Sequence, residues 1–247
     1  MTRELELHGL APHISACVFG CDVVRKKPHP EALLLCLDRR RETAIKHLTF
    51  AVSVVTFAAS LALYGGFRLE VSGMQFTERV PWIGWLGAEY HVGVDGISLL
   101  LVLLTTFLTA VAILSSYAAV TTSVKEYMIC MLLLETGMLG VFVALDLVLF
   151  YVFWEGMLIP MYFLIGIWGG PRRIYATVKF FLYTMAGGVL MLVGIIALYF
   201  LSGAAPGSEY TFDLLKLTGV RLPFQSQVWL FLAFAVAFAI KVPMFPF

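Results

Sequence analysis

Three ionisable residues stand inside long apolar runs of this sequence: Glu135, Glu155 and Lys241. A charge in the lipid interior costs about 2.5 to 3.5 kcal/mol on insertion scales, so each of these residues needs a reason to be there. Charged groups in membrane spans usually face the interior of a helix bundle and belong to an ion or proton path. We therefore predict that Glu155 and Lys241 take part in proton translocation, with Glu135 as a third candidate.

A glutamate and a lysine can act together on a proton if the distance between them changes. A nearby ammonium group stabilises an ionised carboxylate, and its withdrawal favours the protonated acid. A lysine that moves toward and away from Glu155 would make this carboxylate release and take up a proton. The residues alone leave an alternative, in which Glu155 and Lys241 form a static ion pair that only holds two helices together.

Pro160 lies in the same apolar run as Glu155. Proline has no N–H, so the carbonyl of Gly156, four residues earlier, loses its helical hydrogen bond. Because Gly156 directly follows Glu155, we expect the helix to be weakened beside its buried carboxylate.

Two prolines follow Lys241. Pro243 removes the helical donor for the carbonyl of Ala239. Pro246 does the same for the carbonyl of Val242, so the helix is weakened on both sides of the lysine. A helix broken in mid-membrane exposes carbonyls whose partial negative charge can stabilise a cation or a hydrated proton path. The alternative is a packing kink whose freed carbonyls bind neighbouring side chains.

Six apolar stretches must position these residues, and each approaches the roughly 20 residues that a membrane span needs. They cover residues 48–67, 97–120, 128–145, 147–168, 180–201 and 228–247. The third and fourth stretches joined in one helix would be about twice as long as a bilayer is thick, so we expect a turn at Asp146. The fold predicted is all-α: a polytopic transmembrane helix bundle with a broken helix near its C-terminal end.

Composition agrees with a membrane protein. Of the 247 residues, 60% are hydrophobic and 13% are charged, compared with about half and about a quarter in soluble domains. The formal net charge of +1 excludes a general polyanion-binding surface, so we expect lipid and not nucleic acid as a partner. Lys and Arg are concentrated in segments 1–46, 121–127 and 169–179, which predicts a cytoplasmic N-terminus. We divide the chain into a cytoplasmic leader with the residual end of a first span, 1–46, and a transmembrane domain, 47–247.

Other features carry less chemistry. The cysteines do not suggest a disulfide framework, and the spacing of Cys17, Cys21 and His13 is too loose for a metal site. No nucleotide, CxxC or haem motif is present, so we expect no redox cofactor and no metal in this chain. Asp95 is expected to cap a helix. Three glycines are expected to permit close helix packing: Gly187, Gly188 and Gly194.

Longer motifs surround the candidate residues: FYVFWEGMLIPMY at 150–162 with IWGGP at 167–171, HVGVDGIS at 91–98, and AFAIKVP at 237–243. With these segments the sequence from about residue 31 onward resembles the chain M family of bacterial respiratory complex I, whose mitochondrial counterpart is subunit 4 of NADH dehydrogenase. Multi-subunit sodium/proton antiporters share the glutamate and the lysine but differ in the residues around them.

The resemblance implies an antiporter-like, multi-pass subunit of the cell inner membrane. Such a subunit translocates protons, coupled to electron transfer from NADH to quinone in other subunits of the respiratory complex. FMN, iron–sulfur clusters, NADH and quinone are then expected in those partner subunits, and this chain would carry no redox chemistry. By this resemblance Glu155 and Lys241 drive proton movement, whereas Glu135 matches the family less closely.

The family pattern also includes a first span, of which only residues 32–35 remain, and further spans after the broken helix. We therefore expect the sequence to be an N-terminal fragment. Two other functions stay open: a subunit of a sodium/proton antiporter without a redox partner, and a structural fragment that does not conduct.

Overall fold

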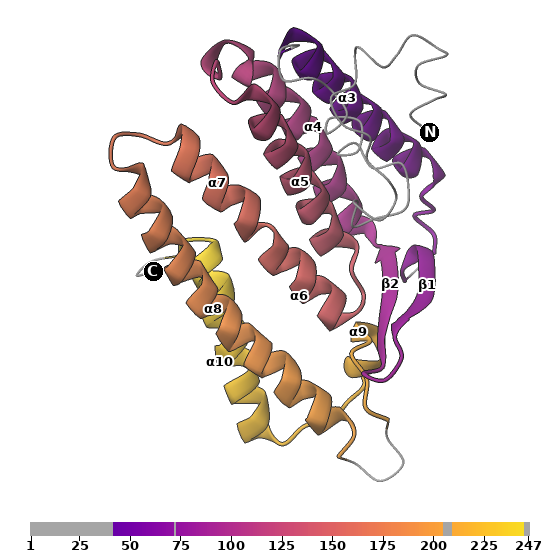
Figure 1. Cartoon of the computed structure of the whole chain (residues 1–247). Helices are drawn as coiled ribbons and strands as arrows, with labels where there is room; N and C mark the ends of the chain where they lie inside the picture. The colour runs from indigo at the N-terminus through magenta and orange to yellow at the C-terminus, as the bar shows by residue number, and fades with distance from the viewer. Residues whose placement is uncertain (1–41, 72, 205–208, 245–247) are drawn as a thin grey trace, which may run out of the picture. The chain divides into compact units, whose positions relative to one another are not determined.

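The computed structural model describes residues 42–71, 73–204 and 209–244 (Figure 1). Within them the chain forms a series of long helices with one pair of strands. The elements are α3 (Glu42–Gly66), β1 (Gln75–Ile83), β2 (Ala88–Val94), α4 (Gly96–Ala119), α5 (Val124–Val143), α6 (Leu147–Gly156), α7 (Leu158–Trp168), α8 (Arg173–Ser202), α9 (Leu214–Leu217) and α10 (Phe224–Lys241). The predicted leader, 1–46, lies almost entirely outside the described residues.

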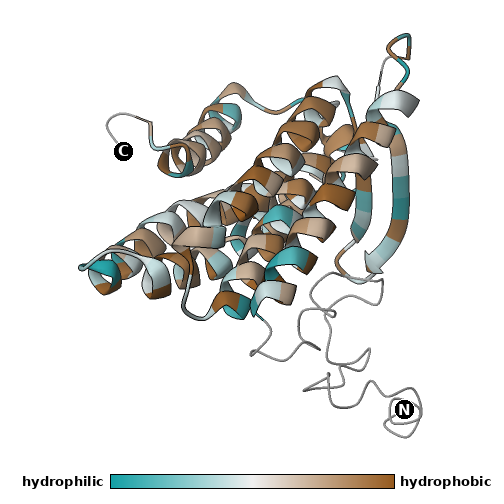
Figure 2. Ribbon diagram, turned by 90° about the horizontal axis from the view of Figure 1, so that it is seen from above, coloured by the Kyte–Doolittle hydropathy of each residue, from teal (hydrophilic) through white to brown (hydrophobic). Residues whose placement is uncertain are grey.

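Six segments of the described part are long and apolar enough to cross a membrane, with α6 and α7 together forming one of them. Figure 2 shows that hydrophobic residues predominate along these helices, while the strands carry several hydrophilic residues. The six spans agree with the prediction, but several boundaries were wrong. The helix α3 begins at Glu42, six residues before the expected start. The helix α8 begins at Arg173, seven residues before the expected start, because Arg173 and Lys179 belong to its exposed first turns. The helix α10 runs from Phe224 only to Lys241.

The chain divides into two compact units, and we describe each by itself. The first unit comprises the described residues up to Phe67 together with Leu100–Thr136. The second unit comprises Arg68–Leu99 and Gly137–Phe247, which includes the strands and the helices from α6 onward.

In the first unit, α3 and α4 are joined by hydrogen bonds from polar side chains. The hydroxyls of Ser60 and Thr106 lie 2.9 Å apart. At the C-terminal end of α4, the ammonium of Lys46 donates to the carbonyls of Tyr117 and Val120 at 2.7 and 2.9 Å. Tyr117 in turn donates its hydroxyl proton to the carbonyl of Lys46. Because these bonds lie at two separate places along α4, they fix the register of the two helices.

The second unit contains an antiparallel β-hairpin that the sequence analysis missed, since residues 68–96 were expected to be a loop. Strands β1 and β2 lie side by side and pair in antiparallel fashion (Figure 1). Val80 lies opposite Tyr90, and Arg79 lies opposite His91. A turn signal was present, because Gly84 and Gly87 lie between the two strands. Gly87 adopts a positive φ of 71° in this turn, a conformation that glycine tolerates without strain. The fold is therefore the predicted transmembrane helix bundle, with one hairpin added among the described residues.

The residue after the hairpin caps α4, as predicted. The N–H of Ser98 donates to the Asp95 carboxylate at 2.7 Å, and the N–H of Asp95 donates to the Ser98 hydroxyl at 2.9 Å. The hydrogen bond from Ser98 lowers the pKa of the Asp95 carboxyl. The cap is thus made by the ionised carboxylate at neutral pH.

The predicted turn at Asp146 is confirmed. The helix α5 ends at Val143 and α6 begins at Leu147. The Asp146 carboxylate caps α6 by accepting from the N–H groups of Val148 and Leu149 at 2.8 and 3.1 Å. Its second oxygen accepts from the N–H of Glu89 in strand β2 at 3.1 Å. One buried carboxylate therefore ties the turn to both the helix and the hairpin.

Backbone hydrogen bonds add to this tie. The N–H of Leu145 donates to the carbonyl of His91, and the N–H of Leu147 donates to the carbonyl of Phe212. The N–H of Leu214 donates to the carbonyl of Leu145. Strand β2, the turn and the segment before α9 are thereby joined at the start of α6.

Candidate functional site

Lys241, the last residue of α10, reaches across to Trp154 in α6. Its Nζ donates a hydrogen bond to the backbone carbonyl of Trp154 at 2.6 Å. The same Nζ lies 4.1 Å from the centroid of the indole ring, within the range of a cation–π interaction. Trp154 thus contacts the ammonium group both through its backbone and through its side chain.

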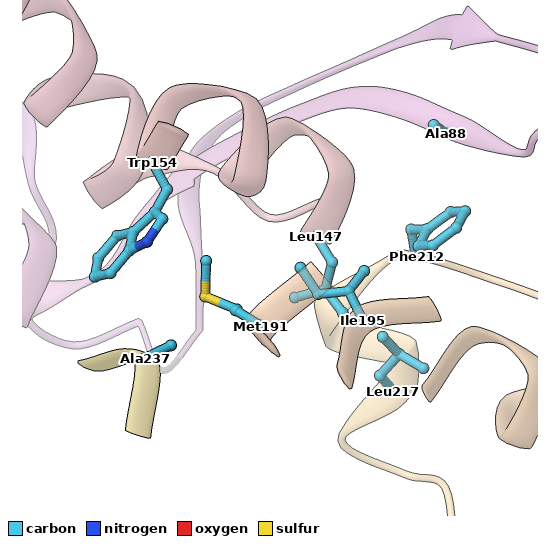
Figure 3. Packing of buried hydrophobic residues seen from close by; sticks show 8 residues of the cluster. All are labelled: Ala88, Leu147, Trp154, Met191, Ile195, Phe212, Leu217 and Ala237. Carbon is cyan, nitrogen blue, oxygen red and sulfur yellow. The ribbon is translucent and has the colours of Figure 1, made fainter. Parts of the chain in front are cut away.

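The indole ring of Trp154 is itself held in place by its surroundings. It stacks on Phe150, one turn earlier in α6, with ring centroids 5.5 Å apart. Phe238, on the same helix as Lys241, packs against it in a T-shaped arrangement, with ring centroids 5.2 Å apart. Figure 3 shows Trp154 together with Met191 of α8 and Ala237 of α10 in one buried cluster. The residue is 9% exposed, so it presents a packed and rigid face to the lysine.

Glu155 follows Trp154 directly in α6 and is partly buried. Its Oε1 atom is buried and has no hydrogen-bond partner among the described residues. Within the part of the chain that the structure describes, Glu155 forms no ion pair with Lys241, whose Nζ donates to the preceding residue, Trp154. The structure therefore brings the two predicted residues into one site but not into direct contact.

A break in the helix separates Glu155 from Pro160, as predicted. The helix α6 ends at Gly156 and α7 begins at Leu158, with Met157 as the cap of both. Pro160 then lies in the first turn of α7. Backbone N–H groups in a first turn have no acceptor within the helix, so a proline there removes no helical hydrogen bond. The interruption places Glu155 in the last turn of a half-helix, where the carbonyls of Phe153 and Glu155 accept from the N–H of Met157.

The expectation of a free carbonyl at Ala239 was wrong. The N–H of Met244 donates to this carbonyl at 2.9 Å, which replaces the bond that Pro243 cannot make. The N–H of Val242 donates to the carbonyl of Phe238, so the end of α10 is closed by its own backbone. The effect expected from Pro246 lies outside the described residues.

Glycines allow α8 to lie close to the site. A Cβ atom at Gly188 would overlap the carboxylate of Glu155. At Gly187 it would lie 3.1 Å from the side chain of Ile240 in α10, and at Gly194 it would lie 3.4 Å from Ala233. The glycines that the sequence analysis assigned to helix packing therefore meet the helices that carry Glu155 and Lys241.

We expect Gly188→Ala to displace the Glu155 carboxylate and to lower proton pumping by roughly threefold or more, because small errors in placement weaken a reacting group strongly. The measurement is pumping by the assembled complex relative to its yield. Gly194→Ala is the matched control on the same helix, since its added methyl group makes only an ordinary contact. Equal pumping by the two variants would contradict a functional role for the placement of Glu155 against α8.

Glu135 lies in α5 and belongs to the first unit, so it is described separately from the other two residues. It is 3% exposed, and its Oε1 has no hydrogen-bond partner among the described residues. A buried carboxylate without a partner fits a role in proton transfer or a site for an internal water molecule. Its predicted role stays a prediction.

The structure adds residues near the site that the sequence analysis did not select. A cavity of about 310 Å³ is bordered by α6, α8, α9 and α10. Phe150 and Phe238 line it, and both also contact Trp154. Asp146 supplies its polar side, and burial raises the pKa of this carboxyl against the opposing effect of three backbone N–H groups. Trp154 could have been selected from the sequence, because it is an aromatic residue directly beside a buried glutamate.

No group of three His, Cys, Asp or Glu side chains that could hold a metal ion is found among the described residues. Cys17, Cys21 and His13 lie outside these residues, as does Cys36. Cys130 in α5 is buried and has a free thiol. The expectation that this chain holds no cofactor or metal stays a prediction.

Comparison with protein families matches residues 144–247 to the family described as "NADH:quinone oxidoreductase/Mrp antiporter, TM". NADH-quinone oxidoreductase subunit M of Rhodobacter capsulatus is 50% identical over 214 residues, which are 81% of this chain and 40% of that protein. NADH-ubiquinone oxidoreductase chain 4 of Chondrus crispus is 39% identical over 216 residues, which are 87% of this chain and 42% of that protein. The chain thus spans about 40% of the length of these curated relatives.

Solved structures with a similar fold also come from respiratory and antiporter complexes. A chain of respiratory complex I from Thermus thermophilus with bound NADH is 31% identical with a TM-score of 0.74, over 88% of this chain and 42% of that one. A chain of the Mrp complex from Dietzia sp. DQ12-45-1b is 21% identical with a TM-score of 0.72, over 88% of this chain and 22% of that one. The second likeness shows a shared fold alone.

Proposed function

We propose, from the premise that this chain belongs to the NADH-quinone oxidoreductase subunit M family, that it serves as a membrane-arm subunit that translocates protons. Electron transfer from NADH to quinone takes place in other subunits and drives this movement. The observation that carries the proposal is the meeting of Lys241 with the segment that bears Glu155, at a break in a membrane helix.

The chemistry follows from the two charges. When the ammonium group of Lys241 approaches the carboxylate, the ionised form of Glu155 is stabilised and its proton leaves for a neighbouring acceptor. When the ammonium group withdraws, the carboxylate takes up a proton from the other side of the path. Alternation between the two arrangements moves protons without any covalent change in the chain.

The redox groups are assigned to the partners. FMN, iron–sulfur clusters, NADH and quinone are bound by other subunits of the complex, and this chain contributes no redox chemistry. Its contacts are with those subunits and with the lipid bilayer of the cell inner membrane, and nucleic acid is not a partner.

Two other functions make different predictions for copurification. A complex that contains flavin and iron–sulfur subunits supports the proposal. Copurification with antiporter subunits alone favours a sodium/proton antiporter, for which the shared fold with the Mrp complex is the supporting observation. A chain that assembles with neither group and conducts no ions would be a structural fragment.

The orientation in the membrane gives a separate prediction. We expect the N-terminus and the turn before α8 to face the cytoplasm, because Lys and Arg are concentrated in those segments. A cysteine introduced at Arg173, which is exposed, should react with a membrane-impermeant thiol reagent only from the cytoplasmic side. A cysteine at Trp85 in the hairpin, which is 87% exposed, is the control for the opposite side. Labelling of position 173 from the periplasm alone would overturn this topology.

A further inference from the structure

The ammonium group of Lys241 has two acceptors available on consecutive residues of α6. It contacts the carbonyl and the ring of Trp154, while the carboxylate of Glu155 lies against α8 at Gly188. Because Glu155 makes no ion pair with Lys241 among the described residues, the lysine rests on the neutral acceptor and not on the charged one.

We propose that Trp154 is a positioning residue that holds the Lys241 ammonium apart from Glu155, so that the pair is separated in this arrangement of the helices. This inference rests on the proposed function and names the group that sets the position of the lysine. The energy of a cation–π contact increases when the cation is removed from water, and indole is the strongest of the aromatic partners. Trp154 therefore gives a desolvated ammonium group a place to rest without a counter-charge.

The local structure supports a defined resting place. Trp154 lies in the last turn of α6, where its carbonyl accepts from the Lys241 ammonium and the helix dipole favours a cation. Phe150 behind the ring and Phe238 at its edge prevent the indole from turning away. Since Phe238 lies one turn before Lys241 in α10, the helix that carries the lysine also fixes the ring that receives it.

The indole ring of Trp154 and the carboxylate of Glu155 compete for one ammonium group. Weakening the cation–π contact should favour the paired arrangement of Lys241 and Glu155 and slow the cycle.

The test compares variants in the full chain assembled with its partner subunits. We expect Trp154→Leu to lower proton pumping by roughly fivefold, because a desolvated cation–π contact changes an equilibrium by at least that factor. Trp154→Phe keeps an aromatic face and should recover much of the rate. Trp229→Phe changes an exposed tryptophan on α10 that is not part of the site. This control variant should pump at nearly the wild-type rate.

A spectroscopic measurement supplements the rates and does not depend on the Leu variant being stable. In the full chain with the other four tryptophans replaced by phenylalanine, the emission of Trp154 should change with Lys241→Met and not with Glu155→Gln. Wild-type pumping by Trp154→Leu, an equal loss in Trp229→Phe, or an emission spectrum that is unchanged by Lys241→Met would overturn the inference. If Glu155→Gln also left pumping unchanged, the proposed function itself would fail, which distinguishes the two results.

Discussion

Glu155→Gln is expected to lower proton pumping by about tenfold or more while leaving assembly of the complex nearly intact. An amide has almost the same shape as the carboxylate and fits the same space beside Gly188, but it cannot take up or release a proton. A neutral amide also costs less to bury in the membrane than a charge. The loss should therefore appear in proton transfer and not in stability.

The measurement is made on membranes that contain the full-length chain in its complex. Pumping, NADH oxidation and the yield of the complex are recorded together. Glu209→Gln, at an exposed side chain outside the spans, is the control for loss of a carboxylate. Wild-type pumping and NADH oxidation with a normal yield would reduce Glu155 to a structural residue.

Proton pumping is expected to depend more on the charge of Lys241 than on the shape of its side chain. Lys241→Arg should assemble and keep part of the activity, because guanidinium also donates hydrogen bonds and stacks on aromatic rings. Lys241→Ala should assemble less stably or pump little, since it leaves the partly buried carboxylate of Glu155 without a cation in the same site. The structure adds a second cause, because the alanine variant also leaves the carbonyl of Trp154 without its donor.

A double variant separates a proton station from a static pair. Glu155→Gln with Lys241→Met removes both charges, and the penalty for an uncompensated charge disappears with them. We expect the double variant to restore assembly but not pumping. If pumping recovered as well, the two residues would only hold the helices together, and the mechanism proposed for them would be wrong.

The sequence predicted the spans and the charged residues because both leave a local signal. Apolar runs of the length of a bilayer and single charges within them can be recognised without knowledge of the fold. The turn at Asp146 could be predicted for a related reason, since one helix through that position would be too long for the membrane.

Contacts between distant segments could not be predicted in the same way. The position of the Lys241 ammonium depends on how α10 packs against α6. The two contacting residues are 87 positions apart in the sequence, and no local pattern around either of them predicts that they come together. The new partner of the Ala239 carbonyl, the N–H of Met244, likewise depends on the conformation that the chain takes after Pro243. The hairpin could not be predicted from apolar runs because its strands lie outside them, although its turn glycines gave a local signal.

The two ends of α6 differ in how firmly they are attached. The start is fixed by the Asp146 carboxylate and by backbone hydrogen bonds to strand β2 and the segment before α9. The other end stops at Met157, where the helix is interrupted. The half-helix can therefore act as a lever with its pivot at the turn. Trp154 and Glu155 lie about 12 Å from that pivot, so a slight tilt would shift both acceptors relative to the lysine while the turn stayed still.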